Sequence, residues 1–409
     1  MAKSANRVGL WLVGACGGVG ATALLGLESI RRGLEPPTGL IGHLAPFDQL
    51  RLAPLDHWVV GGHEIREATP WAAACEMHRQ AGVFRAETLA ACAASLKRCQ
   101  REIRDGAIAH CGQPVAQMAD RPGVHRKESA AGAVERLAHD ISSFRRRHAL
   151  RHVVVINIAS TEPPFAVGKT HQDWPRLSKA LARHGPSPLP ASSLYALAAI
   201  EAGASYINFT PSLGIDAPAL RQRAAQCGTA FMGNDGKTGE TLMKSVLAPM
   251  FAARNLRVLS WVGHNIFGNR DAVALDDPAN KAAKLRSKDH LIHDILGYRP
   301  QTLVSIEYIP SLDDWKTAWD HIHFEGFLGT RMVLQFTWQG CDSLLAAPLV
   351  IELARFAELA VREKFAGPLT HLACFFKSPI DVGEQSFAAQ YATLVDWAGA
   401  QKSIGRTEK

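Results

Sequence analysis

Unbroken apolar runs and helical apolar spacing alternate along the first half of the chain. Arg7–Val13 is an apolar run of the kind that fills a parallel strand covered on both faces, and Val153–Thr161 is a second such run that ends in polar residues. Apolar residues recur at helical spacing after the first run, up to about Arg32, and again through residues 71–150. This alternation predicts an α/β fold with a parallel sheet.

Shorter patterns predict the remaining elements. The expected strands are Thr38–Gly42, Ser205–Ser212, Leu256–Val262, Leu303–Ile309, Met332–Trp338 and residues 369–377. The expected helices are Ser192–Gly203, one that carries Leu242, Val246, Leu247, Met250 and Phe251, and one from Asp342 to about Phe365. Apolar and polar residues alternate in Leu303–Ile309 and Met332–Trp338, which is typical of antiparallel strands.

A glycine-rich turn joins the first strand to the first helix. The candidate contacts in it are Gly14, Cys16, Gly17, Gly18, Val19 and Gly20. Strand, glycine turn and helix form the opening of a dinucleotide-binding domain, because glycines let the backbone approach a pyrophosphate at the N-terminus of the helix. The spacing GxxGGxG differs from GxGxxG, so a tight structural turn is the alternative.

The strand expected at Thr38–Gly42 should end near the adenosine ribose of such a ligand. An acidic residue commonly binds the ribose 2′-hydroxyl there, but the nearest acid is Asp48. The choice between the two nicotinamide cofactors is therefore weakly determined at this point.

Polar side chains gather between Phe231 and Asp294. Asn234–Thr241 is a glycine-punctuated turn that opens a helix, and Lys237, Thr238 and Thr241 add a charge and two hydroxyls to the free backbone N–H groups there. This suits a phosphate, and the absent GxxxxGK[ST] spacing argues against a nucleoside triphosphate. An ordinary capped turn is the alternative.

A second polar loop follows the strand expected at Leu256–Val262. Gly263–Asp271 supplies amides, a carboxylate and an imidazole at a strand end, where open α/β sheets bind ligands. The cations that follow are Lys281, Lys284, Arg286 and Lys288. They are dense enough to bind an anion, although a solvated basic face is the usual explanation.

Composition narrows the class of protein. With 409 residues, 47% of them apolar, the chain is long enough for two domains. The net charge of +7 comes without an aromatic-interleaved basic stripe, which argues against nucleic acid and favours an anionic small substrate. The eight cysteines show no CxxC pair or zinc spacing, so we expect buried thiols and no metal site. No signal peptide and no membrane-spanning run is recognised, which predicts a cytoplasmic protein without a membrane partner.

Four segments, taken together and in order, resemble the myo-inositol-1-phosphate synthase family. They are GNDGKTGETLMKSVLAPMF, GHNIFGNRDAVAL, LRSKD and CDSLLAAPL. The order and approximate spacing match that family, and the likeness extends from the first glycine turn to Lys377. Several motifs in register are more specific than any one of them.

The resemblance implies the domain organisation. It predicts a Rossmann-like NAD-binding domain made of residues 1–241 and 345–409. An α+β domain for catalysis and tetramer assembly, residues 242–344, would be inserted into it. NAD is expected as the cofactor, and the expected assembly is a homotetramer.

The resemblance also implies the residues of the active site. Lys288 and Lys377 match the family's catalytic lysines, and its carboxylates match Asp235, Asp271 and Asp342. The implied cofactor contacts beyond the glycine turn are Ser160, Thr161, Asn208, Thr210 and Asp235. The substrate phosphate would contact Lys237, Thr238, Gly239, Glu240, Thr241 and Asn269.

In that family glucose 6-phosphate is cyclised to 1D-myo-inositol 3-phosphate. The steps are an oxidation at C5, an aldol closure between C6 and C1 and a final reduction, so that NAD is returned unchanged. Preorganised ammonium groups suit the alkoxide and enolate charges that develop on the sugar.

Two departures from the family concern charge. Ile292 and Glu307 stand where the family has lysines, which changes the formal charge of the site by about three units at low dielectric. The cations that could compensate are Lys281, Lys284, Lys316 and Arg331.

Three alternatives remain open. A related carbocyclase could close fructose 6-phosphate to a five-membered cyclitol phosphate. A plain NAD-dependent sugar-phosphate dehydrogenase would release NADH, and a non-catalytic sugar-phosphate or NAD-binding protein would do neither. Net NADH formation and the spectrum of the product separate these readings.

Overall fold

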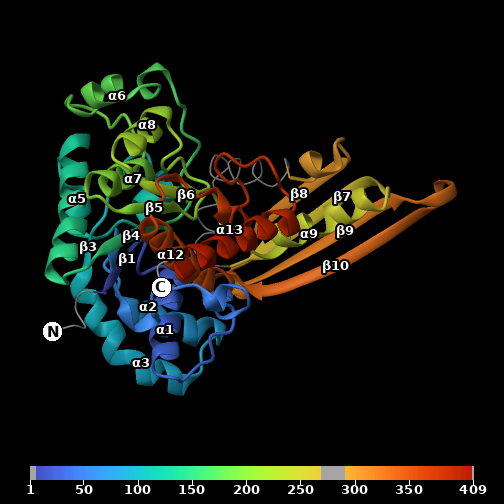
Figure 1. Cartoon of the computed structure of the whole chain (residues 1–409), viewed down its shortest axis with the longest axis horizontal. Coiled ribbons are helices and arrows are strands. Elements are labelled where there is room, and N and C mark those ends of the chain that lie inside the picture. The colour runs from blue at the N-terminus through green and yellow to red at the C-terminus, as the bar shows by residue number, and fades with distance from the viewer. Residues whose placement is uncertain (1–5, 269–290, 408–409) are drawn as a thin grey trace.

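The computed structural model describes residues 6–268 and 291–407, with side chains described as far as residue 401. A parallel sheet and its helices form the main body, and a second sheet projects from it as an arm (Figure 1). The fold class expected from the sequence, a Rossmann-like parallel sheet with a second α+β region, is confirmed.

Seven strands form the parallel sheet in the order β11-β6-β5-β4-β1-β2-β3. They are β1 (Val8–Val13), β2 (Trp58–Glu64), β3 (Ile103–Asp105), β4 (His152–Asn157), β5 (Ser205–Asn208), β6 (Ala230–Gly233) and β11 (Gly367–Pro368). All six residues of β1 are buried, because helices cover both faces of the sheet. In this order β2 and β3 lie on one side of β1 and β4, β5 and β6 on the other. The carboxyl ends of β1 and β4 therefore form the switch point at which such sheets bind ligands.

Helices α1 and α12 cover one face of this sheet, and α5 and α7 pack together on β4 on the other. The described helices of the body are α1 (Gly18–Arg31), α2 (Pro70–Ala81), α3 (Ala86–Cys99), α4 (Gln113–Gln117), α5 (Ala130–Arg147), α6 (Trp174–Leu181), α7 (Ala191–Glu201), α8 (Pro218–Gln226), α12 (Asp342–Arg362) and α13 (Phe387–Thr407). Within the described residues no helix is long and apolar enough to span a bilayer.

The arm is a four-stranded sheet in the order β10-β9-β7-β8. Its strands are β7 (Arg257–Phe267), β8 (Gln301–Tyr308), β9 (Trp315–Glu325) and β10 (Arg331–Cys341). One face packs against helix α9 (Gly239–Ala253) and residues 291–296 in a small core that includes Phe251, Trp261 and Ile322.

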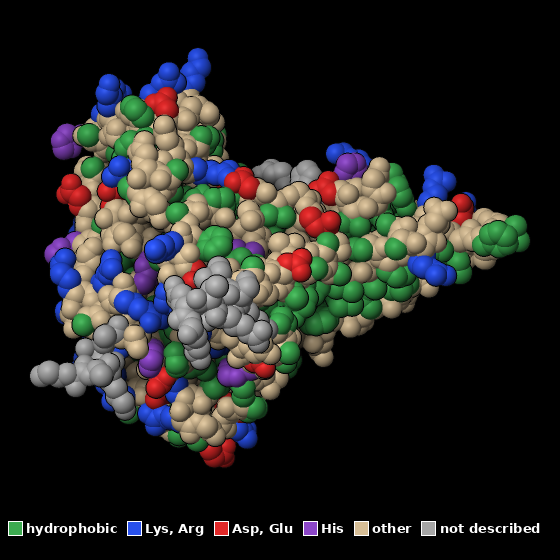
Figure 2. Space-filling model, viewed as in Figure 1, with side chains coloured by type: hydrophobic (Ala, Val, Ile, Leu, Met, Phe, Trp, Pro, Cys, Tyr) green, Lys and Arg blue, Asp and Glu red, His purple; other side chains and the backbone are tan. Residues whose placement is uncertain are grey.

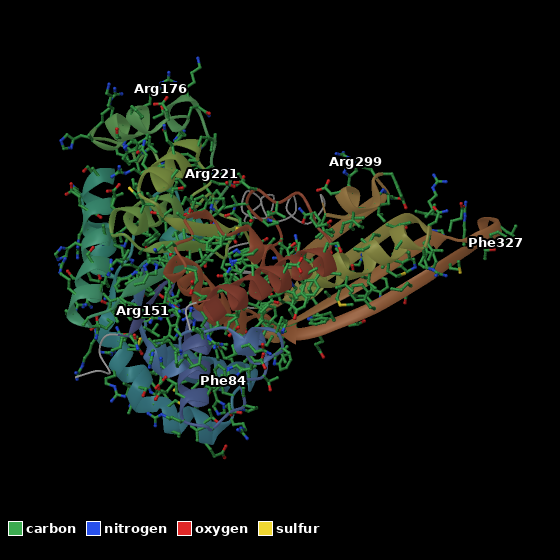
Figure 3. All side chains as sticks on the ribbon, in the orientation of Figure 1. Phe84, Arg151, Arg176, Arg221, Arg299 and Phe327 are labelled. Carbon is green, nitrogen blue, oxygen red and sulfur yellow. The ribbon has the colours of Figure 1, made fainter. Side chains whose placement is uncertain are left out.

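The other face of the arm stays open. Register places Leu303, Trp319 and Val333 on it, and these side chains are 53%, 37% and 51% exposed. Phe327 and Leu328 extend from the tip at 87% and 86% exposure, where Figure 3 labels Phe327. Figure 2 shows apolar side chains along the arm and at its end.

Several elements differ from the sequence prediction. Residues 38–42 form a turn, with Gly39 at a φ of +89°, that leads into the 3₁₀ helix Ile41–His43, and the second strand is instead β2. Residues 369–377 are not a strand, since the pairing segment is β11 and Thr370–Phe375 is a 3₁₀ helix. Two strands were expected to be antiparallel to their neighbours. Strand β10 pairs with β9 in this way, whereas β8 pairs with β7 in parallel.

Candidate active site

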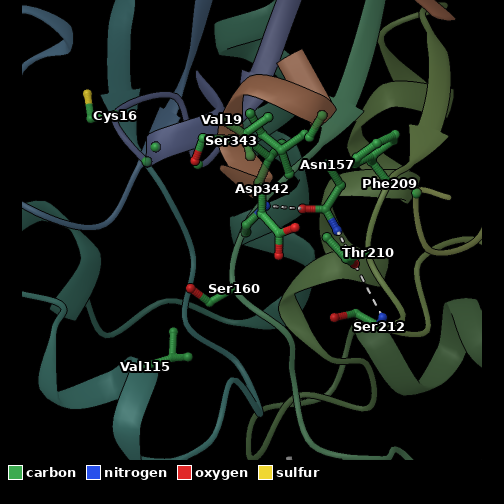
Figure 4. Close-up of a pocket in the computed structure, with 18 of the residues that line it drawn as sticks. Cys16, Val19, Val115, Asn157, Ser160, Phe209, Thr210, Ser212, Asp342 and Ser343 are labelled. Carbon is green, nitrogen blue, oxygen red and sulfur yellow. Dashed lines mark hydrogen bonds between the residues drawn. The ribbon is translucent and has the colours of Figure 1, made fainter. Parts of the chain in front are cut away.

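A cavity of about 560 Å³ opens at the carboxyl ends of β1 and β4, between the parallel sheet and the base of the arm. The sequence candidates that line it are Gly14, Cys16, Gly17, Gly18, Val19, Ser160, Thr210, Asp235, Thr238, Glu240, Thr241, Asp342 and Lys377. Figure 4 shows Asp342 and Ser343 beside Val19, with Asn157, Thr210 and Ser212 across from them. The volume is within the range of small-molecule and cofactor sites.

The glycine turn leaves space for a phosphate against the start of α1. Gly17 is the N-cap, no side chain caps the helix, and its first turn holds no acid. A Cβ on Gly18 would lie 2.5 Å from Ser343 Oγ, and one on Gly20 would lie 2.4 Å from Ala15 O. The turn therefore requires glycine, and its free N–H groups suit the pyrophosphate of a dinucleotide.

Glu64 is a site residue that the sequence reading missed. It ends β2, only 2% exposed, and its carboxylate accepts a 3.0 Å hydrogen bond from the Cys16 backbone N–H. It ends the second strand of the sheet, which is Trp58–Glu64, whereas the strand expected at Thr38–Gly42 had no acid nearer than Asp48. The signal was present in WVVGGHE, an apolar run that ends on an acid.

The polar residues after β4 and β5 form one hydrogen-bonded wall. Asn157 Nδ2 donates to Asn208 Oδ1 at 3.1 Å and to Thr210 Oγ1 at 3.2 Å. Ser160 and Thr210 line the cavity, whereas Thr161 and Asn208 are buried and lie outside the described lining. Asn208 acts as a strand-end cap, since its Nδ2 donates to Ser212 O at 2.7 Å.

Glu162 is a second lining residue that was missed. Its carboxylate accepts a 2.8 Å hydrogen bond from the Ser192 backbone N–H and a second from the Ser192 hydroxyl at 2.5 Å. Burial raises the pKa of Glu162 to about 7, against the opposing effect of the hydrogen bonds from Ser192 and Ser212. No local pattern marks this residue, because α7 and the loop after β5 bury it.

Lys377 and Asp235 meet at the floor of the cavity. Lys377 Nζ donates to Asp235 Oδ1 at 2.8 Å, and the side chains are only 9% and 7% exposed. A backbone hydrogen bond of 2.7 Å from Lys377 N to Asp235 O fixes the same pair. A buried, held ammonium group therefore faces the space that the glycine turn also borders.

Lys316 and Asp342 form a looser pair at the base of the arm. Their charged atoms are 3.5 Å apart, with side chains 13% and 29% exposed. Lys316 Nζ also lies 5.2 Å from the centre of the Phe267 ring. Both residues line the cavity, so Lys316 brings in a cation that the sequence reading named only as a compensating candidate.

The N-terminus of α9 borders the cavity through Thr238, Glu240 and Thr241. Glu240 Oε1 lies 2.6 Å from Lys244 Nζ, and both side chains are 1% exposed, so the acid is neutralised in place. Lys237 turns away from the described lining, because its Nζ donates to Gln390 Oε1 at 2.6 Å. Burial lowers the pKa of Lys237 to about 8.

Ile292 and Glu307, the two residues that depart from the family pattern, lie away from the cavity lining just described. Ile292 is 1% exposed in the core under the arm, and Glu307 is an exposed residue on the open face of β8. Neither is among the described residues that line the cavity. Arg331 is exposed at the start of β10, and Asn269, Asp271, Lys281, Lys284, Arg286 and Lys288 lie outside the described residues.

The remaining chemistry is limited in the described chain. All eight cysteines are free thiols, and burial raises the pKa of Cys16, which lies in the glycine turn. Among residues 6–268 and 291–401, no group of three or more His, Cys, Asp or Glu side chains is arranged to hold a metal ion.

Comparisons of the sequence with known proteins find a matching family and a similar full-length relative. The family described as myo-inositol-1-phosphate synthase matches residues 8–398 of the chain. Inositol-3-phosphate synthase 1 of Bacteroides thetaiotaomicron is 33% identical over 402 residues, which cover 92% of this chain and 90% of that protein.

Two solved structures share the fold. Inositol-3-phosphate synthase from Caenorhabditis elegans superposes with a TM-score of 0.86 at 23% identity, covering 97% of this chain and 86% of that one. A myo-inositol-1-phosphate synthase-related protein from Thermotoga maritima has a TM-score of 0.79 at 23% identity, covering 96% and 98%.

Proposed function

The chain belongs to the myo-inositol-1-phosphate synthase family, and from this we propose that it cyclises glucose 6-phosphate to 1D-myo-inositol 3-phosphate. It is an isomerase-type enzyme, and NAD is its cofactor. The observation that carries the proposal is the Lys377–Asp235 pair, held at 2.8 Å in the cavity that the glycine turn also lines. A buried cation beside a dinucleotide cradle suits a reaction that develops negative charge on a sugar.

Dinucleotide binding is proposed at the turn Gly14–Gly20, with Ser160 and Thr210 lining the cavity on the β4 and β5 side and the buried Thr161 and Asn208 supporting them from behind. When bound, NAD supplies reversible hydride transfer. Ser160 and Thr210 would orient the bound dinucleotide by hydrogen bonds, and the buried strand ends would exclude water. Asp235 lies between this wall and Lys377, so it is proposed to contact both cofactor and substrate.

Lys377 is proposed to stabilise the alkoxide and enolate oxygens of the substrate. Its ammonium group needs no reorganisation during the reaction, because Asp235 already holds it in position. Lys288 is proposed as the second catalytic cation, on the resemblance alone, since it lies outside the described residues. Asp342 and Asp271 are the proposed further carboxylates, and Lys316 pairs with Asp342.

The substrate phosphate is proposed to bind at the N-terminus of α9, against Thr238, Gly239 and Thr241. Free N–H groups and the helix dipole favour an anion there. Glu240 would repel it, but Lys244 neutralises that carboxylate at 2.6 Å. Asn269 is proposed to contact the phosphate, whereas Lys237 is proposed to add its charge from behind the loop.

The domain division and assembly belong to the same proposal. Residues 1–241 and 345–409 would form the NAD-binding domain, and residues 242–344 the catalytic and assembly domain. The pairing of β11 with β6 supports the discontinuous boundary, because it completes the parallel sheet from late in the chain. The open apolar face of the arm supports association with further copies of the chain, and the homotetramer is proposed from the resemblance.

The decisive experiment is a product analysis. The purified protein is incubated with NAD and with glucose 6-phosphate that carries carbon-13 at C1 and C6, and the mixture is followed by NMR. We expect a new one-bond coupling between these two carbons, in an inositol phosphate, without net formation of NADH.

Other outcomes would contradict the proposal in distinct ways. A five-membered cyclitol phosphate formed from fructose 6-phosphate alone would indicate a different carbocyclase. NADH formed in proportion to substrate would indicate a dehydrogenase. NAD binding without conversion of either sugar phosphate would indicate a non-catalytic protein.

A further inference from the structure

Helix α2 forms a wall of the cavity beside the glycine turn. Three of its residues that line the cavity are Met77, Gln80 and Ala81. Met77 packs the helix against α1, because its Sδ lies 3.6 Å from Thr22 Oγ1. A Cβ on Gly18 would lie 3.7 Å from the same sulfur. The helix therefore covers the start of α1, where the dinucleotide is proposed to bind.

The base of the arm forms a second wall. Strand β9 begins at Trp315, and the two residues that flank Trp315 in the chain both line the cavity. Trp315 is paired with Cys341 at the end of β10, and Ser343 follows in the first turn of α12. Ser343 Oγ lies 2.5 Å from where a Cβ on Gly18 would be, so this wall also reaches the glycine turn.

A hydrogen bond joins the two walls. Trp315 Nε1 donates to the Ala81 carbonyl oxygen at 2.9 Å. Ala81 is the last residue of α2, and the final carbonyl groups of a helix have no partner within the helix. Trp315 is 40% exposed and is not among the described lining residues, so the bond lies at the outer edge of the cavity.

These contacts form a ring around the proposed dinucleotide site. They run from Gly18 along α2 to Ala81 and Trp315, and then through Cys341 and the start of α12 back to Gly18. The other connections are packed helices or paired strands. The Trp315–Ala81 bond is a single contact of a partly exposed side chain, so it can break without disturbing either wall.

The proposed reaction depends on keeping the cofactor in place. The hydride taken from C5 has to return from the reduced cofactor to the ring. If NADH leaves before that step, sugar phosphate and NAD have become a keto sugar phosphate, NADH and a proton. A closed outer edge that slows dissociation therefore suits a cycle without net oxidation.

We propose that Trp315 closes the outer edge of the dinucleotide cavity and slows exchange of the cofactor. It is a positioning residue that acts through α2, and the inference rests on the proposed binding of the dinucleotide at the glycine turn. Its hydrogen bond joins two protein groups, so its loss should speed association and dissociation together and leave the equilibrium affinity almost unchanged. Loss of a residue that only supports the shape of the site would weaken the affinity instead.

The test is Trp315→Phe, which keeps an aromatic ring and removes the N–H donor. Stopped-flow mixing with NADH gives the association rate constant, and displacement of bound NADH by excess NAD gives the dissociation rate constant. We expect both to rise about fivefold, which corresponds to about 1 kcal/mol for one hydrogen bond. The dissociation constant from calorimetric titration should stay within about twofold of the parent value.

The matched control is Trp174→Phe, the same exchange at the start of α6. The Trp174 ring lies 5.1 Å from the Arg223 guanidinium carbon and is not among the described lining residues, so neither rate constant should change. Turnover gives a second readout. With glucose 6-phosphate and NAD, Trp315→Phe should release NADH and keto sugar phosphate in equal amounts, whereas the parent protein and Trp174→Phe should release neither.

The outcomes separate this inference from the proposed function. If NADH binds and both rate constants of Trp315→Phe equal those of the parent, Trp315 does not close the cavity, and the proposed function is untouched. A rise in the dissociation rate alone, with a matching loss of affinity, would make Trp315 a structural support and overturn the inference. If neither NAD nor NADH binds to the parent, both proposals fail. If the rate constants change as expected but glucose 6-phosphate is not converted, the role of Trp315 stands and the proposed function fails.

Discussion

The two sheets of this molecule differ in how their faces are covered. In the parallel sheet β1 is buried along its whole length, since helices pack on both sides. In the arm only one face is packed, and β10 is exposed or partly exposed from Arg331 to Gly340. The parallel sheet, which carries the proposed cofactor-binding turn, is thus covered within one chain, whereas the arm retains an apolar face of the kind that marks an interaction surface.

This difference predicts where substitutions act. Changes in the parallel sheet should alter ligand binding, chemistry and stability at any protein concentration. Changes on the open face of the arm should act through assembly and should depend on concentration.

The largest expected effect is loss of the cofactor site in Gly20→Val. Its side chain would meet the Ala15 carbonyl oxygen, 2.4 Å from where a Cβ would lie, and push the turn out of shape. We expect NAD affinity to fall by more than about 100-fold, or about 2.7 kcal/mol, in calorimetric titration. Gly26→Ala on the same helix is the control, because a Cβ there meets nothing within 4 Å. Unchanged NAD affinity in Gly20→Val would show that the cofactor does not bind at this turn.

The next largest effect is expected at Lys377, the proposed catalytic cation. Lys377→Ala should lower turnover, measured by product NMR, by about 10²–10³, as removal of one preorganised oxyanion donor does. NAD titration shows whether the site still folds, and Lys179→Ala on the exposed side of α6 is the control. If Lys377→Ala binds NAD and turns over within a few-fold of the parent, the Lys377–Asp235 pair is structural.

A third effect concerns the pH dependence of stability in the parallel-sheet region. The pKa of Glu162 is about 7 in the folded protein against 4.5 as its ordinary value, so the folded state binds more protons between these pH values. Stability should therefore fall as the pH rises through this window, by about 3 kcal/mol at about 1.4 kcal/mol per pKa unit.

Glu162→Gln tests this by keeping the shape and removing the titration. The midpoint of thermal unfolding should drop less between pH 5 and pH 8 in the variant than in the parent. An equal drop in both proteins would show that Glu162 stays ionised when folded.

The smallest expected effect is on the arm. Leu303→Ala removes an apolar side chain that is 53% exposed, and if a second copy covers this face, association should weaken by about 1–2 kcal/mol. Sedimentation over a range of protein concentrations measures it. Leu34→Ala, at a residue 37% exposed outside the arm, is the control. A change in NAD affinity without a change in assembly would break the contrast between the two sheets.

Sequence predicted β1 and β4 of the parallel sheet well, because burial on both faces leaves unbroken apolar runs. Arg7–Val13 and Val153–Thr161 are such runs, and the glycine turn after the first marks where the helix begins. Strand β9 was missed, because Lys316, Asp320 and two histidines interrupt its apolar residues, and Glu64 was missed with the position of β2.

The sequence predicted only part of the candidate site. Asp235 and Lys377 are 142 residues apart, and only β6 and the segment after β11 bring them together. The charge deficit inferred from Ile292 and Glu307 stays a prediction: in the described structure Ile292 packs in a core and Glu307 is exposed on β8. Side-chain direction on a strand depends on register, which pattern alone did not determine.

The pairing of β11 with β6 has a consequence for how the protein is made. Ribosomes deliver the chain from its N-terminal end, and domains begin to fold as they emerge. The glycine turn and six of the seven parallel strands are synthesised early, whereas the edge strand and Lys377 follow the whole arm. A nascent chain interrupted before Gly367 would carry the proposed dinucleotide cradle without its cation. Catalytic competence would thus appear late in translation, after the arm has been made.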